Sequence, residues 1–370
     1  MTRRPPIADW PERDRALWEK GVEPKGLFDG GGAGAGWSDA SRFKTARGYR
    51  HWLLWLTAQG FCDPNSSAAD RVTRERVAGY VAELRPLRAP YTVLCRIREL
   101  YDAMRVMAPE TDWDWLSELH CTLSAGVRPV RDKLPRLRPI GELDDLGQRL
   151  MDEAEAAPGW PARRRAVLFR DGLVIALLAC RPVRLKNLAM MRLGRHLVKE
   201  GGSWQMLFGA HETKTHILYE GMVPSTLAPR LERYLDVHRP VLLRGKCVRD
   251  RANTMPRSDG ETSIHPEIDA VWVSEVGTQI EQAALAHRVV KHTKAAFGRS
   301  VSPHLFRDCV ATSIALDNPK HVGDASLVLG HAGHRMTEKH YNHGRSLEAS
   351  RRHATTIARL RETLNAGRKR

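Results

Sequence analysis

The stretch FRDGLVIALLACRPVRLKNLAMMRL, residues 169–193, decides the fold of this chain. It begins as a strongly apolar helix that is too short to span a membrane, and Pro182 interrupts it, so it predicts a buried core helix. After it the apolar residues change to a spacing of two, which is typical of strands. Three short strands are predicted, the first two joined by a Gly201–Gly202 turn, in HLVKE (196–200), SWQMLFGAHETK (203–214) and HILYEGMVP (216–224).

Helices resume after these strands, at about Ala228 and again near Thr278. The polar stretch from Arg244 to Glu267 lies between them and indicates an exposed insertion. The C-terminal part of the chain, residues 140–370, is therefore predicted to be one domain that is mainly helical and contains a small antiparallel sheet.

Before this domain, three segments predict amphipathic helices. Ser38 is placed to cap the first, Gly60 to end it, and Thr73 to cap the second. Together they predict a small helical bundle over residues 38–126. The three segments are SDASRFKTARGYRHWLLWLTAQG (38–60), VTRERVAGYVAELRPL (72–87) and APYTVLCRIRELYDAMRVM (89–107).

Two further segments are predicted to lack a packed structure. Residues 1–37 are rich in Pro, Arg and Gly and end in GGGAGAGW, which is similar to a phosphate loop but follows no strand, so we expect a flexible arm. Residues 127–139, VRPVRDKLPRLRP, carry three prolines and five basic residues, which favours an extended linker whose charge suits a phosphate backbone.

The composition favours a nucleic-acid partner. The chain of 370 residues has a formal net charge of +16, which attracts polyanions. No apolar run approaches the roughly 20 residues that span a bilayer, and the N-terminus lacks an apolar signal core, so we expect no membrane partner and a cytoplasmic location. The six cysteines form no C-x-x-C pair, which argues against a zinc ribbon.

Several side chains of the second domain suit the handling of a phosphate. Metal-free DNA cleavage needs a nucleophile, donors for the non-bridging oxygens, and an acid for the departing oxygen. Arginine suits the second task because its planar fork stays charged, lysine suits the third, and tyrosine can be the nucleophile. On a helix, His304 and Arg307 would lie on one face. The candidates are Arg184, Lys214, His304, Arg307, His331 and Tyr341.

These residues occur in an order that resembles the tyrosine recombinases, the phage-integrase family. The resemblance implies a mainly α chain, with an N-terminal helical core-binding bundle that binds DNA and a C-terminal mixed α/β catalytic domain with a small antiparallel sheet. The motifs that carry it are R-x-x-N-L (184–188), the hairpin Lys214, H-L-F-R (304–307), L-G-H (329–331) and K-H-Y (339–341).

The resemblance also implies a role for each residue. Tyr341 would attack the scissile phosphate and form a 3′-phosphotyrosyl link, while Arg184 and Arg307 clamp the non-bridging oxygens. Lys214 would be the general acid. His304 and His331 would assist by proton handling or hydrogen bonding. No cofactor, metal or ATP is implied. The implied partners are duplex recombination sites, further copies in a homo-tetramer, and accessory recombination proteins.

The chain departs from the family pattern around the first arginine. The family has Gly-x-Arg-x-x-Glu there, whereas this chain has Pro182 and Asn187 in place of the glycine and the glutamate. Arg181 is therefore a competing candidate for Arg184, and Lys199 competes with Lys214 in the same sheet region. Arg96 and Arg98, in the bundle, either face DNA or belong to a solvated basic surface.

The histidine-rich stretch LGHAGHRMTEKHYNH, residues 329–343, also suggests a metal site. It contains no cysteine and its one carboxylate is not at a familiar ligand spacing, so metal is disfavoured. Thr337 would cap the helix that presents Tyr341. The basic tail after Arg345 predicts a helix with one apolar side. The resemblance implies that this helix docks on a neighbouring subunit; the alternative is that it packs on its own domain. Two other functions stay open: a type IB topoisomerase, and a DNA-binding accessory protein without catalysis.

Overall fold

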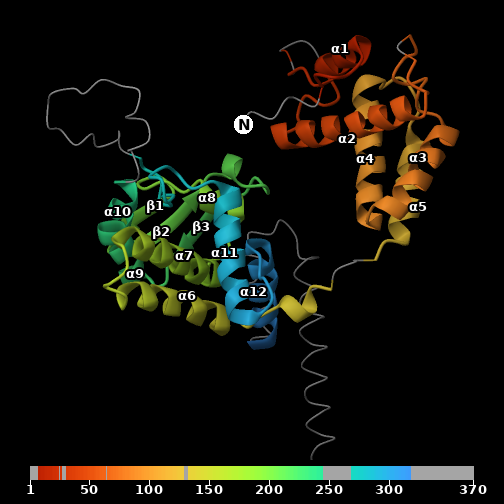
Figure 1. Ribbon diagram of the computed structural model, residues 1–370. Coiled ribbons are helices and arrows are strands. Elements are labelled where there is room, and N and C mark those ends of the chain that lie inside the picture. The colour runs from red at the N-terminus through yellow and green to blue at the C-terminus, as the bar shows by residue number, and fades with distance from the viewer. Residues whose placement is uncertain are drawn as a thin grey trace, which may run out of the picture. The chain divides into compact units, whose positions relative to one another are not determined.

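The computed structural model describes residues 7–24, 26, 31–63, 65–128, 132–244 and 268–317. The chain divides into two compact units, Met1–Asp132 and Lys133–Arg370, and each is described by itself (Figure 1). Within the described ranges, no helix combines the length and the apolar character that crossing a membrane requires. The predicted fold class is confirmed: the chain is mainly helical and carries one small antiparallel sheet.

The first unit is a helical bundle in which the predicted caps are observed. Ser38 Oγ accepts a hydrogen bond from the backbone N–H of Ser41, and Thr73 caps the next long helix in the same way. Gly60 has a φ of 72°, the left-handed conformation that ends a helix most cheaply in glycine. The helices of this unit are α1 (Glu12–Gly21), α2 (Asp39–Ala58), α3 (Arg74–Leu87), α4 (Pro90–Met107) and α5 (Asp114–Ala125).

The prediction of a flexible arm over residues 1–37 is wrong for the described part of that segment. Residues 12–21 form α1, and Trp10 and Trp18 are buried in the core of the bundle. The glycines serve a close backbone contact, because a Cβ on Gly32 would lie 2.1 Å from the carbonyl oxygen of Gly21. Burial of the tryptophans outweighs the local preference of a Gly- and Pro-rich segment for disorder.

A buried ion pair holds α1 in place. The Asp14 carboxylate accepts from Arg71 at 2.5 Å and from the Tyr49 hydroxyl at 2.8 Å, and the Asp14 and Arg71 side chains are fully buried. Burial, and then the neighbouring Asp14 charge, raise the pKa of Tyr49 well above its ordinary value, so it remains a hydrogen-bond donor.

The buried pair predicts a large effect on stability. Asp14→Asn leaves the Arg71 charge buried without its counter-charge, so the free energy of unfolding should fall by about 3–5 kcal/mol. Asp9→Asn is the matched control, since Asp9 pairs with Arg50 on the surface and its loss should cost about 0–1 kcal/mol. Urea titrations followed by tryptophan fluorescence measure both. Equal effects would mean that α1 is not part of the stable bundle.

The second unit is built around α7 (Ala162–Cys180), the apolar helix of the opening stretch (Figure 1). Helix α6 (Ile140–Glu155) and α7 approach closely at two glycines, since a Cβ on Gly147 would lie 2.7 Å from the backbone nitrogen of Ala176. The elements are α6 (Ile140–Glu155), α7 (Ala162–Cys180), α8 (Leu185–Ala189), β1 (Leu197–Glu200), β2 (Ser203–Phe208), β3 (Tyr219–Met222), α9 (Ala228–Arg233), α10 (Arg239–Leu243), α11 (Gln282–Phe297) and α12 (Pro303–Asp317).

The three strands pair in chain order, β1–β2–β3, with both pairs antiparallel. Leu197 lies opposite Met206, and both side chains enter the core of the second unit. A helix begins at Ala228, as predicted, but α11 begins at Gln282 rather than near Thr278. The delay has a local cause, because Val273 and Gln279 form a β-bridge just before α11. Residues 245–267, nearly all of the predicted insertion, lie outside the described residues.

The linker predicted over 127–139 is wrong in its second half, which packs on α12 and the residues before it. Lys133 forms an ion pair with Asp308 at 3.1 Å, and Arg136 Nε donates to the carbonyl of Ser300 at 2.9 Å. The backbone N–H of Arg138 faces the sulfur of Cys309. These basic residues, expected to follow a phosphate backbone, instead bind acceptors of the second unit. That unit therefore begins at Lys133 and not at residue 140.

Candidate active site

Arg184 follows the end of the central helix. Pro182 cannot continue α7, and the chain turns so that Arg184 becomes the N-cap residue of α8. Its side chain is half-buried, and burial lowers the pKa of the guanidinium below its ordinary value. The apolar helix thus delivers an arginine to the rim of the core.

Arg307 comes from α12, far along the chain, and meets the same turn. Its side chain is 7% exposed, and Nη1 donates to the carbonyl oxygen of Pro182 at 2.6 Å. Burial, and then the charge of Arg184, lower the pKa of Arg307 to about 10. Two guanidinium groups held this close repel each other, so an anion bound to both would be favoured.

The two arginines line one small cavity, and β2, β3 and the loop between these strands also contribute lining residues. Thr213 and Thr215, on either side of Lys214, are among the lining residues, whereas Lys214 itself is exposed and is not. A flexible four-carbon stem separates the lysine ammonium from its backbone. The cavity is lined by Val183, Arg184, Asn187, Phe208, Thr213, Thr215, Ile217, Leu218, Tyr219 and Arg307.

The competing lysine, Lys199, lies on β1, opposite the start of β2. It forms an ion pair with Glu232 at 2.6 Å, and its ammonium lies over the ring of Trp204. Lys199 is paired in register with Trp204 beside the turn that joins β1 to β2, whereas the Lys214 loop follows Phe208 at the far end of the strand. Of the two lysine regions, the Lys214 loop lines the cavity and the Lys199 region does not.

The competing arginine, Arg181, is turned toward the sheet. Its Nε donates to the carbonyl oxygen of Met222, on β3, at 2.8 Å. Arg181 does not line the cavity that Arg184 and Arg307 share. Asn187, which replaces the family's glutamate, lines the cavity and donates its amide to the carbonyl of Glu212 at 3.4 Å. A carboxylate could not make that bond, because it has no proton to donate.

His304 lies in the first turn of α12, one turn before Arg307. Its side chain is exposed, and its pKa lies below the ordinary value, first because of partial desolvation; Asp308 opposes this shift, and the charges of Lys133, Arg307 and Arg184 add to it. The lowered pKa favours the neutral form of His304. The structure thus brings together His304, Arg307 and Arg184.

The remaining predicted site residues, His331 and Tyr341, lie outside the described residues. So do Thr337, the histidine-rich stretch and the basic tail. Among the side chains that the structure describes, no group of three or more His, Cys, Asp and Glu could hold a metal ion.

The sequence interpretation missed a buried pair beside the site. Glu212 and His196 hydrogen-bond at 3.0 Å just before the Lys214 loop, and both side chains are buried. One local signal in the sequence indicates the position of Glu212. Gly209 followed three residues later by a glutamate has the spacing of a capping box, and the backbone N–H of Gly209 does donate to the Glu212 carboxylate.

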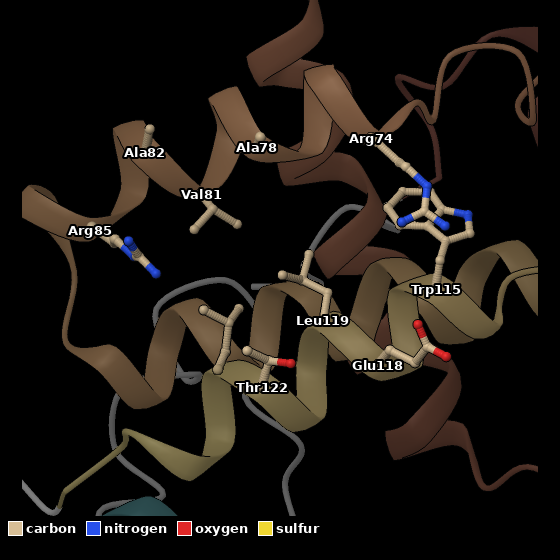
Figure 2. A pocket seen from close by; sticks show the side chains of 10 residues that line it. Arg74, Ala78, Val81, Ala82, Arg85, Trp115, Glu118, Leu119 and Thr122 are labelled. Carbon is tan, nitrogen blue, oxygen red and sulfur yellow. The ribbon is translucent and has the colours of Figure 1, made fainter.

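A second cavity, in the first unit, contains none of the predicted catalytic residues. It has a volume of about 470 Å³ and lies between α3 and α5 (Figure 2). Ala78 and Ala82 line it from α3 and Leu119 lines it from α5, and Arg74 lies over the ring of Trp115 at one end. None of the residues that line this cavity lines the cavity of Arg184 and Arg307.

One solved structure agrees with this architecture. No protein-family model and no curated protein sequence matches the chain. XerH site-specific recombinase, bound to a palindromic difH substrate in a post-cleavage complex, is similar in structure, with 16% identity, a TM-score of 0.50, and coverage of 84% of this chain and 78% of XerH.

Two further solved structures match over the same share of this chain, 84%. XerA recombinase has 15% identity, a TM-score of 0.36 and 89% of its own chain covered. A lambda integrase dimer bound to a COC′ core site has 14% identity, a TM-score of 0.46 and 90% covered. From the XerH match, the chain has the fold of the tyrosine recombinases, the family that its motifs resemble.

Proposed function

We propose that this protein is a site-specific DNA recombinase that cuts and rejoins strands through a phosphotyrosine. The observation that carries the proposal is the cavity in which Arg184, from the turn after α7, meets Arg307, from α12, beside the Lys214 loop. Two arginines that share one small cavity suit the two non-bridging oxygens of a phosphodiester.

The reaction conserves the phosphodiester bond energy. The Tyr341 oxygen attacks phosphorus while its proton passes to His304 or His331, the bond from phosphorus to the 5′ oxygen breaks, and Lys214 gives that oxygen a proton. The products are a 3′-phosphotyrosyl ester and a free 5′-hydroxyl. A 5′-hydroxyl from the partner strand then attacks the ester and releases Tyr341, so the exchange needs no ATP. Arg184 and Arg307 stabilise the charge that grows on the phosphate oxygens.

Strand exchange distinguishes the proposal from its rivals. The protein is incubated with two duplexes that carry a candidate site from the DNA flanking its gene, and the products are sequenced. A recombinase joins the two duplexes at one defined position. A type IB topoisomerase would instead relax supercoiled plasmids that lack any site, and an accessory protein would bind without changing either substrate.

The first unit offers a surface for duplex DNA, which we name the α2–α4 basic face: Lys44, Arg47 and His51 on α2, with Arg88 and Arg96 nearby. Lys44, Arg47 and His51 are exposed and share one side of α2. The pKa of His51 is lowered, first by desolvation and then by Arg96 and Arg47. Concentrated positive charge of this kind binds phosphates.

The two arginines of α4 that the sequence left open take different positions. Arg96 pairs with Glu99, and its charge acts on His51 of this face. Arg98 pairs with Asp102 at 3.0 Å, lies over the ring of Tyr101, and acts on His120 of α5 instead. We infer that Arg96 contributes to the DNA-binding charge and that Arg98 does not.

Removing one charge from the α2–α4 basic face should weaken binding without changing sequence preference. Arg47→Ala should make the negative slope of log affinity against log salt shallower by about 1, since each phosphate contact releases about one counterion. Arg98→Ala removes the same charge elsewhere and should leave the slope unchanged. Fluorescence anisotropy on labelled duplex across a salt series measures both. Equal changes of slope in the two variants would mean that DNA responds to the overall positive charge of the unit, and that the α2–α4 basic face is not the binding surface.

The assembly that exchanges strands is a homo-tetramer on two DNA sites, and the proposed place of action is the cytoplasm. Sedimentation of the protein with and without site DNA tests the assembly. A fourfold increase in protein mass on two duplexes is expected.

A further inference from the structure

We propose that Glu212 and His196 are positioning residues for Lys214: they form a buried hydrogen-bonded chain that fixes the start of the loop carrying the general acid. The inference rests on the proposed function, because it assumes that Lys214 protonates the leaving oxygen. Glu212 and His196 do not line the cavity of Arg184 and Arg307, so they act through the loop.

This chain of hydrogen bonds begins at the backbone of Arg192. Its N–H faces His196 Nδ1 at 3.1 Å, so Nδ1 is the acceptor and the ring proton resides on Nε2. Nε2 then donates to Glu212 at 3.0 Å. The His196 ring is 1% exposed and stacks on Phe208, the last residue of β2, with centroids 5.4 Å apart. The histidine is thus fixed in both orientation and tautomer.

Glu212 receives the other end of this chain. Its second carboxylate oxygen accepts from the backbone N–H of Gly209 at 2.9 Å, and Arg195 also donates to the carboxylate. Burial alone would raise the pKa of Glu212, but the hydrogen bonds from His196 and Gly209 outweigh it and hold the pKa at about 2. The carboxylate therefore stays charged, and it fixes the turn Ala210–Glu212 at both ends.

The next residue, Thr213, closes the loop itself. Its buried hydroxyl lies 2.8 Å from the carbonyl of Ile217 and accepts from the backbone N–H of Ile217 at 3.1 Å. His216 takes a positive φ of 54°, which lets the chain return over so short a span. Lys214 is therefore carried on a short loop whose two ends are bonded to each other.

This rigidity has a consequence for proton transfer. Lys214 has a long, exposed side chain, so the position of its backbone sets the region that its ammonium can reach. Displacement of a catalytic group by about 1 Å can cost on the order of 100-fold in rate. We therefore expect loosening of Glu212 to affect the protonation of the leaving oxygen more than the attack on phosphorus.

The test uses two forms of the same DNA substrate. In one, sulfur replaces the bridging 5′ oxygen at the scissile phosphate; a thiol has a pKa of about 8.5, so a thiolate departs without a proton. Cleavage under single-turnover conditions is compared for the full-length protein, K214A, E212Q and T213V. E232Q is the matched control, since Glu232 binds Lys199 and Trp204 at the other end of the sheet.

K214A should be slow on the oxygen substrate and restored on the sulfur substrate. E212Q and T213V should follow it, with losses of about 10- to 100-fold on oxygen that largely disappear on sulfur. E232Q should match the unmodified protein on both. Thermal melting of each variant identifies any that does not fold, and T213S, which keeps the hydroxyl, should restore the rate lost in T213V.

Equal losses on both substrates in folded E212Q and T213V would overturn the positioning role, because the defect would then lie in the site as a whole. Failure of the sulfur substrate to restore K214A would instead overturn the assignment of Lys214 as the general acid. The two failures are distinguishable, since the first appears while K214A is rescued and the second does not depend on Glu212.

Discussion

Replacing Tyr341 by phenylalanine is expected to abolish the covalent protein–DNA adduct, because the variant has no oxygen with which to attack phosphorus. The substrate is a nicked duplex that carries the candidate site, so that the cleaved end diffuses away and the adduct accumulates. A denaturing gel measures the adduct as a band that retains labelled DNA. DNA binding by the variant should remain, since only one hydroxyl is removed.

Tyr219 provides a demanding control. It lines the cavity of Arg184 and Arg307, so it is the tyrosine that the described site itself would offer as a nucleophile. Burial raises the pKa of Tyr219, although the charges of Arg181 and Arg307 oppose the shift, and a phenol that resists ionisation attacks poorly. Y219F should therefore keep the adduct. If the adduct is lost in Y219F but kept in Y341F, Tyr219 rather than Tyr341 is the nucleophile. If the unmodified protein binds DNA and forms no adduct, the result favours a DNA-binding accessory protein without catalysis.

Local signals predicted the elements whose causes are local. Ser38 and Thr73 form caps with residues three positions away, and the Gly60 conformation is a property of that residue. The switch from helical spacing to a spacing of two located the hairpin for the same reason. Such interactions depend on neighbours in the sequence, so they can be predicted without knowledge of the tertiary fold.

The errors arose where a distant contact outweighs local composition. Trp10 and Trp18 draw residues 7–22 into the bundle, and Asp14 finds Arg71 only after the chain has folded. The prediction of a linker over residues 127–139 was wrong for the same reason, because Lys133 forms an ion pair with the distant residue Asp308. Composition describes what a segment does alone and contains no information about such partners.

The candidate site shows the same division. Its residue types and their order were visible in the sequence, but the choice between Arg181 and Arg184 depends on the turn at Pro182. The contact between His196 and Glu212 depends on the fold of the hairpin, and neither residue has a motif of its own. Prediction of their joint role requires the three-dimensional structure.

Replacing either arginine of the cavity is expected to lower the rate of DNA cleavage by about 10²- to 10³-fold, the loss typical of removing one donor to a developing oxyanion. R184A and R307A should show this loss in single-turnover cleavage at saturating protein. R307K is the more informative variant, because lysine keeps the charge but not the planar fork, and it should recover only part of the rate. Recovery of the full rate would mean that the charge alone matters.

The double variant R184A/R307A tests whether the two arginines act on one phosphate. Each guanidinium lies in the same cavity, and the charge of Arg184 lowers the pKa of Arg307, so their contributions are coupled. Residues that act as a unit lose less together than the product of their separate losses. The combined loss should therefore fall well short of about 10⁴-fold. If the loss of rate in the double variant equals the product of the two single losses, Arg184 and Arg307 contact different groups. Arg184 and Arg307 would then not bind one phosphate together.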